Sequence, residues 1–281
     1  MGDSSKIYPM PFIKNNYFLA YEYNKVMKID YFGNVKWSIY LKTPENNRLH
    51  HWGDVMENKI YLPSRNFIDL PNEISQKIGP YFQNCYKKNS FNDTIEIFDG
   101  KLGQHIKTIE LNHLFVEFTD LHFYFRNCVD PIHLNDVRII KEKSHAKFFK
   151  DGKVGDLLIS LGHIHTIALL DKDTYQIKWY AHGDFTRQHS PRITNRGTII
   201  IFDNSSSNPK NGNARVTEID IKTKKVVGFY EATKDDYFLS EVGGRIQLID
   251  DRIFVQESDN GRVFELVCYE KEEYLSNKCK Q

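Results

Sequence analysis

Short apolar runs separated by turn residues recur along the whole chain, and helical periodicity is scarce. The clearest stretch, residues 155–181, reads as a strand, a turn, a strand ending in Leu170-Asp171, a short turn, and a strand that closes on Trp179. Apolar runs bounded by turn residues in this way are typical of β-strands. The pattern therefore predicts antiparallel strands joined by tight turns.

The same unit is repeated elsewhere. It returns at residues 17–40, 197–232 and 251–270, and a looser copy is divided between residues 58–65 and 93–111. A four-stranded unit with a period of roughly 40–60 residues is typical of a β-propeller. A parallel α/β fold is disfavoured because helical crossovers between the strands are missing. We predict one all-β propeller domain over residues 1–281, with five blades visible as repeats and a sixth if the terminal segments close the ring.

Long insertions interrupt the repeat at residues 63–92 and 112–132. The second is rich in Phe and His and reads "HLFVEFTDLHFYFRN" over most of its length. Long loops in a compact domain are usually functional or disordered. Their aromatic content favours packed loops that shape the mouth of a substrate site.

Three histidines precede first strands of successive repeats. His51 begins "HWGDV", His133 begins "HLNDV", and His189 stands ahead of "GTIII". A single histidine before a strand is more often structural, but three at one repeat position favour a site. Because the innermost strand of each blade lines the channel of a propeller, we expect the three rings to converge there.

Imidazole at this place suits nucleophilic and acid–base chemistry, since a neutral ring can attack and a neighbouring ring can carry the proton. Three residues beside the histidines could orient the rings, or serve as ordinary turn residues: Asp54, Asn135 and Asp136. Two other functions stay open. One is a metal-dependent hydrolase or lyase with the three histidines and Glu241 as ligands. The other is a non-catalytic propeller that binds a ligand.

Several motifs together carry a family resemblance. They are H-x-N-D in "HLNDV", Q-H-x-P in "RQHSP", and the ending "ESDNGRVFE". Residues 130–267, and more loosely 10–62, resemble the arylsulfotransferase family. The resemblance implies a six-bladed, exported propeller that passes a sulfuryl group between phenols through a sulfohistidine. It makes His189 the nucleophile and His133 a ligand of the sulfuryl oxygens, and His51 matches a further family histidine.

The chain departs from the family at one position. Where the resemblance implies an arginine, the sequence reads Ser160-Leu161-Gly162. Charge that develops on the sulfonyl oxygens is normally stabilised by a preorganised cation. Candidates for substrate binding in its place are Arg187, His163 and His165. We expect alternation along a strand to put the two histidines on one face; each is equally well read as a packing or surface residue.

Charge and composition limit the classes of binding partner that we expect. The 38 Lys+Arg residues balance 37 Asp+Glu residues, which gives no footprint for nucleic acid or an anionic membrane. No apolar run reaches the length of a membrane span, and the first residues lack the apolar core of a signal peptide. We expect a small anionic or aromatic substrate and no cofactor; localisation and homo-oligomerisation stay open. The four cysteines form no CxxC pair, so no metal knuckle is expected.

Overall fold

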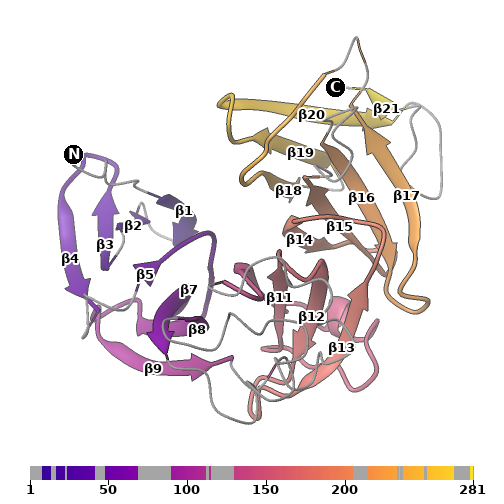
Figure 1. Cartoon of the computed structure of the whole chain (residues 1–281). Helices are drawn as coiled ribbons and strands as arrows, with labels where there is room; N and C mark the ends of the chain where they lie inside the picture. Colours follow the sequence, from indigo (N-terminus) through magenta and orange to yellow (C-terminus); the bar gives the residue numbers. More distant parts are fainter. Residues whose placement is uncertain are drawn as a thin grey trace. The chain divides into compact units, whose positions relative to one another are not determined.

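The computed structural model describes residues 8–13, 17–22, 24–41, 48–68, 90–111, 114, 130–204, 214–232, 234, 237–249, 252–268 and 279–280. The chain divides into two compact units, Met1–Val137 and Arg138–Gln281, and each is described by itself. Strands dominate both units in Figure 1, and a short helix, α3 (Lys143–Ala146), follows the first strand of the third sheet. The prediction of an all-β fold is confirmed.

The first unit holds two antiparallel sheets. In the first sheet, neighbours in the sequence are neighbours in space: β1 (Tyr8–Ile13), β2 (Tyr17–Glu22), β3 (Lys25–Asp30) and β4 (Val35–Tyr40). The second sheet has the order β5 (Arg48–Leu49), β7 (Lys59–Ile68), β8 (Ser90–Asp99) and β9 (His105–Glu110), and β6 (Asp54–Met56) also pairs with β7.

Three further sheets follow in the sequence, and β10 crosses the boundary into the second unit. The third sheet consists of β10 (Leu134–Ile139), β11 (Leu157–Leu161), β12 (Thr166–Leu170) and β13 (Ile177–His182). The fourth consists of β14 (His189–Ile193), β15 (Thr198–Asp203), β16 (Arg215–Asp220) and β17 (Val226–Glu231). The fifth consists of β18 (Arg245–Ile249), β19 (Arg252–Glu257), β20 (Arg262–Cys268) and β21 (Cys279–Lys280).

Consecutive up-and-down sheets of four strands are the blades of a β-propeller. The described residues form five of these sheets, in step with the five repeats of the sequence. A sixth blade is not among the described residues.

An aspartate turn explains why the repeat is visible in the sequence. In four sheets the third strand leads into a turn capped by its aspartate: Asp30, Asp99, Asp171 and Asp220. In the third sheet, Asp171 Oδ1 accepts from the backbone N–H groups of Asp173 (2.9 Å) and Thr174 (3.0 Å). A short carboxylate that bonds the backbone two or three residues later favours a turn. The recurring aspartate therefore sets where the third strand ends and the fourth begins.

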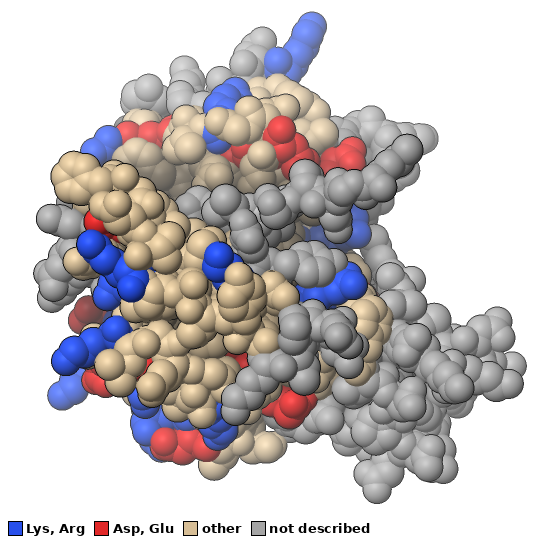
Figure 2. Space-filling model, turned by 90° about the vertical axis from the view of Figure 1, so that its left-hand side faces the viewer, with Lys and Arg blue, Asp and Glu red and all other residues tan. Residues whose placement is uncertain are grey.

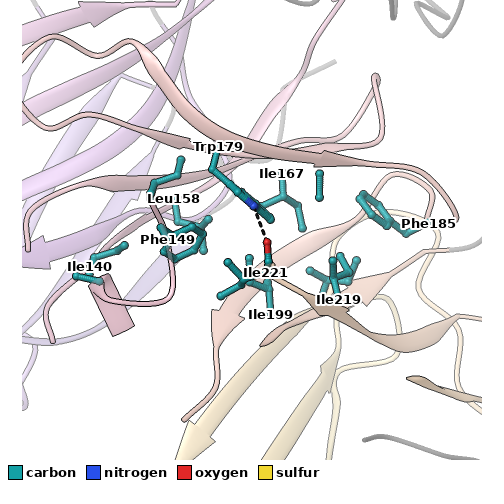
Figure 3. Packing of buried hydrophobic residues seen from close by; sticks show 13 residues of the cluster. Ile140, Phe149, Leu158, Ile167, Trp179, Phe185, Ile199, Ile219 and Ile221 are labelled. Atoms are coloured by element: carbon teal, nitrogen blue, oxygen red, sulfur yellow. Dashed lines mark hydrogen bonds between the residues drawn. The ribbon is translucent and has the colours of Figure 1, made fainter. Parts of the chain in front are cut away.

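The core of the second unit is built from strands that are buried on both faces. Every residue of β11, β12 and β15 is buried, which explains their continuous apolar runs. Figure 3 shows Trp179 of β13 packed among Phe149, Ile167 and their neighbours, with its indole Nε1 donating to the carbonyl oxygen of Ile221 at 2.8 Å. This bond links the last strand of the third sheet to the turn after β16.

The structure corrects the edges of the predicted insertions. Residues 63–68 and 90–92 are strand, because β7 and β8 pair continuously from Lys59 opposite Asp99 to Ile68 opposite Ser90. The intervening residues 69–89 lie outside the described residues, as does most of the second insertion at 112–132. On the face seen in Figure 2, basic and acidic side chains are interspersed, which agrees with the formal net charge of +1.

Candidate functional site

The first unit brings His51 and His133 together. Their Nε2 atoms lie 2.9 Å apart, and the ring centroids are separated by 4.9 Å in an edge-to-face arrangement. His50, which sequence analysis passed over, lies against both rings with centroid distances of 5.1 and 5.9 Å. Three imidazoles therefore gather at one place in this unit.

The backbone holds the two H-x-x-D-V segments side by side. Trp52 and Asp136 form a parallel bridge, and Val137 donates its N–H to the carbonyl of Trp52 at 3.0 Å. The chain passes so close to β7 at Gly53 that a Cβ there would lie 2.0 Å from the carbonyl oxygen of Tyr61. Only glycine fits this approach, which explains why the first copy reads H-W-G-D where the second reads H-L-N-D.

A charged pair orients His133. Asp130 Oδ2 lies 2.5 Å from His133 Nδ1, and Arg65 Nη1 donates to the same oxygen at 3.1 Å. The guanidinium of Arg65 in turn lies over the Phe91 ring, 4.1 Å from its centroid. Because a carboxylate only accepts, Nδ1 of His133 carries the proton. In a neutral His133, Nε2 is therefore unprotonated and accepts a hydrogen bond, and the donor is the Nε2–H group of His51.

A second acid lies beside this group. Asp93 is fully buried, and its Oδ1 is 3.6 Å from His50 Nε2. Burial, with repulsion from Asp130, raises the pKa of Asp93 to about 7. Burial, followed by the charge of Arg65, lowers the pKa of His50 well below its usual value. Burial thus favours the neutral forms of both partners.

The three residues predicted to orient the histidine rings lie in the first unit, where one bonds the backbone and two are buried on a strand. Asp54 Oδ1 accepts from the N–H of Val55 at 2.8 Å, as a residue that begins a strand does. Asn135 and Asp136 are fully buried on β10. Asp130, three residues before His133, is a ring partner of His133 that the sequence did not single out.

His189 is the first residue of β14, in the second unit, and is 4% exposed. Its Nδ1 lies 2.8 Å from Oδ1 of Asn204, which follows β15. The amide nitrogen of Asn204 donates to the carbonyls of Ser240 (2.7 Å) and Gly243 (2.6 Å). His189 is therefore held by a neutral amide, and its convergence with His51 and His133 stays a prediction.

Backbone conformation separates His189 from the other two histidines. His51 and His133 share a left-handed backbone with φ of 55°, whereas near His189 the positive φ values belong to Arg187 and Ser190. The equivalence of the three positions in the repeat stays a prediction.

The family resemblance implies an arginine just after the end of β11, and in this chain the side chain of Gln188 hydrogen-bonds to this end of the strand. The amide nitrogen of Gln188 lies 3.1 Å from Ser160 Oγ, 3.3 Å from the carbonyl of Leu161 and 2.9 Å from that of Thr166. Gln188 is fully buried. Its amide is a neutral donor, so it does not replace the missing charge.

The prediction that His163 and His165 alternate along a strand is wrong. Strand β11 ends at Leu161 and β12 begins at Thr166, so both histidines lie in the connecting turn. His163 is half-buried, whereas His165 is buried and its Nδ1 accepts from the backbone N–H of Arg187 at 3.2 Å. Arg187 itself is half-buried.

Strained backbone is concentrated at the predicted site residues. Of nine described non-glycine residues with positive φ, four are among them: His51, His133, His165 and Arg187. A left-handed backbone costs such residues about 1–2 kcal/mol each. Strain of this kind is found disproportionately at functional sites.

Glu241, the fourth ligand of the metal alternative, is exposed, and its backbone N–H donates to Asp259 Oδ2 at 2.6 Å.

The sequence contains local patterns that mark two of the residues near His51 and His133 that were not predicted. His50 is adjacent to His51, and Asp130 forms a D-x-x-H spacing with His133. No local signal marks Asp93 or Arg65, whose relevance depends on strand pairing.

The family model described as arylsulfotransferase (ASST) matches residues 17–272. The chain belongs to the arylsulfotransferase family. Membership confirms the resemblance drawn from "HLNDV", "RQHSP" and "ESDNGRVFE". A search among curated proteins gives no match for this arylsulfotransferase-family chain.

Two solved structures are similar to this family member at low sequence identity, and the first of them shares its fold. A protein of unknown function from Bacteroides caccae has a TM-score of 0.53 and 9% identity, over 89% of this chain and 74% of its own. The Neurospora crassa Pan2 WD40 domain has 13% identity and a TM-score of 0.45, over 98% of this chain and 69% of its own. In the described part of the chain, no helix is long and apolar enough to cross a membrane.

Proposed function

We propose that this arylsulfotransferase-family chain transfers a sulfuryl group from one phenolic compound to another through a covalent adduct on His189. The observation that carries the proposal is His189 itself. It is a buried imidazole in the family-matched segment, with Nδ1 hydrogen-bonded to Asn204. A neutral ring bonded at Nδ1 has its lone pair on Nε2, which is the atom that attacks.

In the proposed reaction His189 Nε2 forms a bond to sulfur while the sulfur–oxygen bond to the donor phenol breaks. The departing phenolate takes up a proton, and His51 and His133 are the rings that supply it and bind the sulfuryl oxygens. A proton on this pair is balanced by Asp130, which accepts from His133 Nδ1. The proposal requires both histidine sets to act on one substrate.

Anion binding without the family arginine falls on the remaining polar residues. Arg187 is our candidate cation, because its backbone is anchored by His165 two residues before His189. The other proposed contributors to substrate binding are His163, His165, Asn135 and Asp136. A less complete set of fixed cations predicts a slower transfer than an arginine at position 162 supports.

The experiment is incubation of the purified chain with nitrophenyl sulfate, with and without an acceptor phenol. The proposal expects nitrophenol release, intact-mass detection of one added sulfuryl group, and loss of that adduct when the acceptor is added. Absence of both turnover and adduct with a panel of aryl sulfates overturns it. Retention of the aryl sulfate without turnover favours a non-catalytic, ligand-binding propeller instead.

One observation favours a second candidate, a metal-dependent hydrolase or lyase that uses His51, His133, His189 and Glu241. A carboxylate that accepts from Nδ1 of a histidine, as Asp130 does from His133, is the usual support for a metal ligand. The Nε2 atoms of His51 and His133, 2.9 Å apart, are at a separation that one ion can bridge. Elemental analysis and Zn²⁺ titration decide. Stoichiometric metal lost in a His51→Ala, His133→Ala double variant supports this candidate, and absence of metal overturns it.

A further inference from the structure

The nucleophile proposed above is held by one residue that neither the repeat nor the family motifs single out. Asn204 is fully buried immediately after β15, and its Oδ1 lies 2.8 Å from His189 Nδ1. Strands β14 and β15 pair at this end, with His189 opposite Phe202. The amide and the ring are therefore placed against each other by adjacent strands of one sheet.

The orientation of this amide is decided by its other partners. Asn204 Nδ2 lies 2.7 Å from the carbonyl oxygen of Ser240 and 2.6 Å from that of Gly243. Carbonyl oxygens only accept, so both must face the NH₂ group. Oδ1 then faces His189 and also only accepts. The proton between them must belong to Nδ1 of the ring.

We propose that Asn204 is a positioning residue that holds His189 in the Nδ1–H tautomer, so that Nε2 alone carries the nucleophilic lone pair. This inference rests on the proposed function for its catalytic meaning. In the first step the Nε2 pair forms the nitrogen–sulfur bond, and the donor phenolate leaves with the sulfur–oxygen pair and is protonated. In the second step an acceptor phenol gives its proton to the His51–His133 pair that protonated the donor phenolate, the phenol oxygen attacks sulfur, and the nitrogen–sulfur pair returns to Nε2.

A neutral amide suits both steps. When Nε2 is sulfurylated the ring becomes positively charged, and its Nδ1–H bond to Asn204 Oδ1 becomes charge-assisted and stronger. When the ring is free, the amide adds no negative charge that would draw a second proton onto the ring. Asn204 therefore stabilises the adduct more than the free histidine, without protonating the nucleophile.

A pair of hydrogen bonds made by Ser190 fixes the backbone next to His189. Ser190 Oγ accepts from the N–H of Ile246 at 2.9 Å and donates to the carbonyl of the same residue at 3.1 Å. Asn204 and Ser190 thus both tie the neighbourhood of His189 to the fifth sheet. Rigid support of this kind is what accurate aiming of a reacting atom requires.

The test is ¹⁵N NMR of histidine-labelled protein, in which two-bond couplings identify the protonated ring nitrogen. We expect the wild-type His189 signal to report Nδ1–H with a bare Nε2 in the absence of any substrate. An Nε2–H tautomer in the wild type overturns the inference. This readout does not depend on turnover or on any variant folding.

Three variants extend the test. Asn204→Leu, which keeps the branching of the side chain at Cγ, should give mixed tautomers and lower turnover about 10- to 100-fold, the size typical of an outer-shell partner. Asn204→Asp should convert His189 to the doubly protonated imidazolium near neutral pH. Asn195→Asp is the matched control, because Asn195 is exposed and its Oδ1 lies 3.3 Å from Nε2 of the half-buried His145. It should leave the His189 spectrum and the turnover unchanged.

The two hypotheses fail in different ways. A wild-type Nδ1–H tautomer that Asn204→Leu disturbs supports the assignment to Asn204, and if no aryl sulfate is turned over the proposed function alone is overturned. Turnover with a sulfuryl adduct, but with a His189 tautomer that is the same in wild type and Asn204→Leu, overturns the role of Asn204 and leaves the proposed function standing.

Discussion

The two units support their histidines by opposite means. In the first unit, Nδ1 of His133 is bonded to a carboxylate that is itself paired with Arg65. In the second unit, Nδ1 of His189 is bonded to an amide whose remaining donors are taken by backbone carbonyls. Both partners fix the same tautomer. They differ in charge, and charge decides whether a ring more readily keeps a proton or a lone pair.

The surroundings reinforce the difference. The group around His133 gathers three imidazoles, two buried or partly buried acids and a guanidinium. The partner of His189 Nδ1 is neutral: it is the amide of Asn204, whose NH₂ group is bonded to backbone carbonyls. Under the proposed function, this difference in the partner of Nδ1 would prepare His133 for proton transfer and His189 for nucleophilic attack.

Removing the two rings should give the largest effect. His189→Ala is expected to abolish aryl-sulfate turnover and adduct formation, because no other group holds the bond to sulfur. His133→Ala should slow the reaction by about 100- to 10,000-fold, the usual range for proton transfer, yet leave adduct detectable by intact mass. Wild-type turnover in His189→Ala would reverse the roles assigned to the two units.

Neutralising the carboxylate of the first unit should have the next largest effect. Asp130→Asn turns the support of His133 into an amide like that of His189, so its ring loses the charge that balances a proton. Turnover should fall about 10- to 100-fold. Asp173→Asn is the control, since Asp173 is exposed and pairs with the exposed Lys172 in a hairpin turn. Equal turnover in Asp130→Asn and wild type would show that the difference in charge has no catalytic meaning.

Asp93 makes stability depend on pH. Its pKa is about 7 in the folded state against 3.8 as the ordinary value. Between these values the folded state holds the proton and the unfolded state does not, so the free energy of unfolding falls as pH rises from about 4 to 7. In Asp93→Asn this loss is absent. Relative to wild type, the variant should gain on the order of a few kcal/mol between pH 4 and 8.

Urea unfolding of both proteins at several pH values measures this difference. Other titrating groups, including His50, are common to wild type and variant, so the difference curve isolates Asp93 and its coupling to its neighbours. Parallel curves over this pH range would show that Asp93 is ionised throughout in the folded state, which contradicts the raised pKa on which this prediction depends.

The smallest effect compares two tryptophans at matching places in the units. Trp179 Nε1 donates to the carbonyl of Ile221 at 2.8 Å, whereas Trp37 Nε1 is buried with no hydrogen-bond partner among the described residues. Substitution of each by Phe removes similar volume, so the difference reflects the hydrogen bond. Trp179→Phe should be more destabilising by about 1 kcal/mol. Urea midpoints of the two variants measure it, and equal losses would contradict the expectation.

Much of the fold could be predicted because its signals are local. The aspartates that end third strands bond backbone groups two to four residues away, so the repeat is visible without tertiary information. The failures have equally local causes. Strand alternation does not extend to His163 and His165 because β11 ends at Leu161, and the predicted insertion overlaps a strand because β7 continues to Ile68.

The sequence by itself determined the all-β repeat and the family, and it indicated His51, His133 and His189 as candidate site residues. Only the tertiary structure decided what each ring is bonded to. Asn204 is 15 residues from His189 and reaches carbonyls 36 and 39 residues further on, and Arg65 is 65 residues from Asp130. The physical reason is that a hydrogen bond depends on distances of about 3 Å between groups brought together by strand pairing. Residue types and spacing constrain such distances only within a turn.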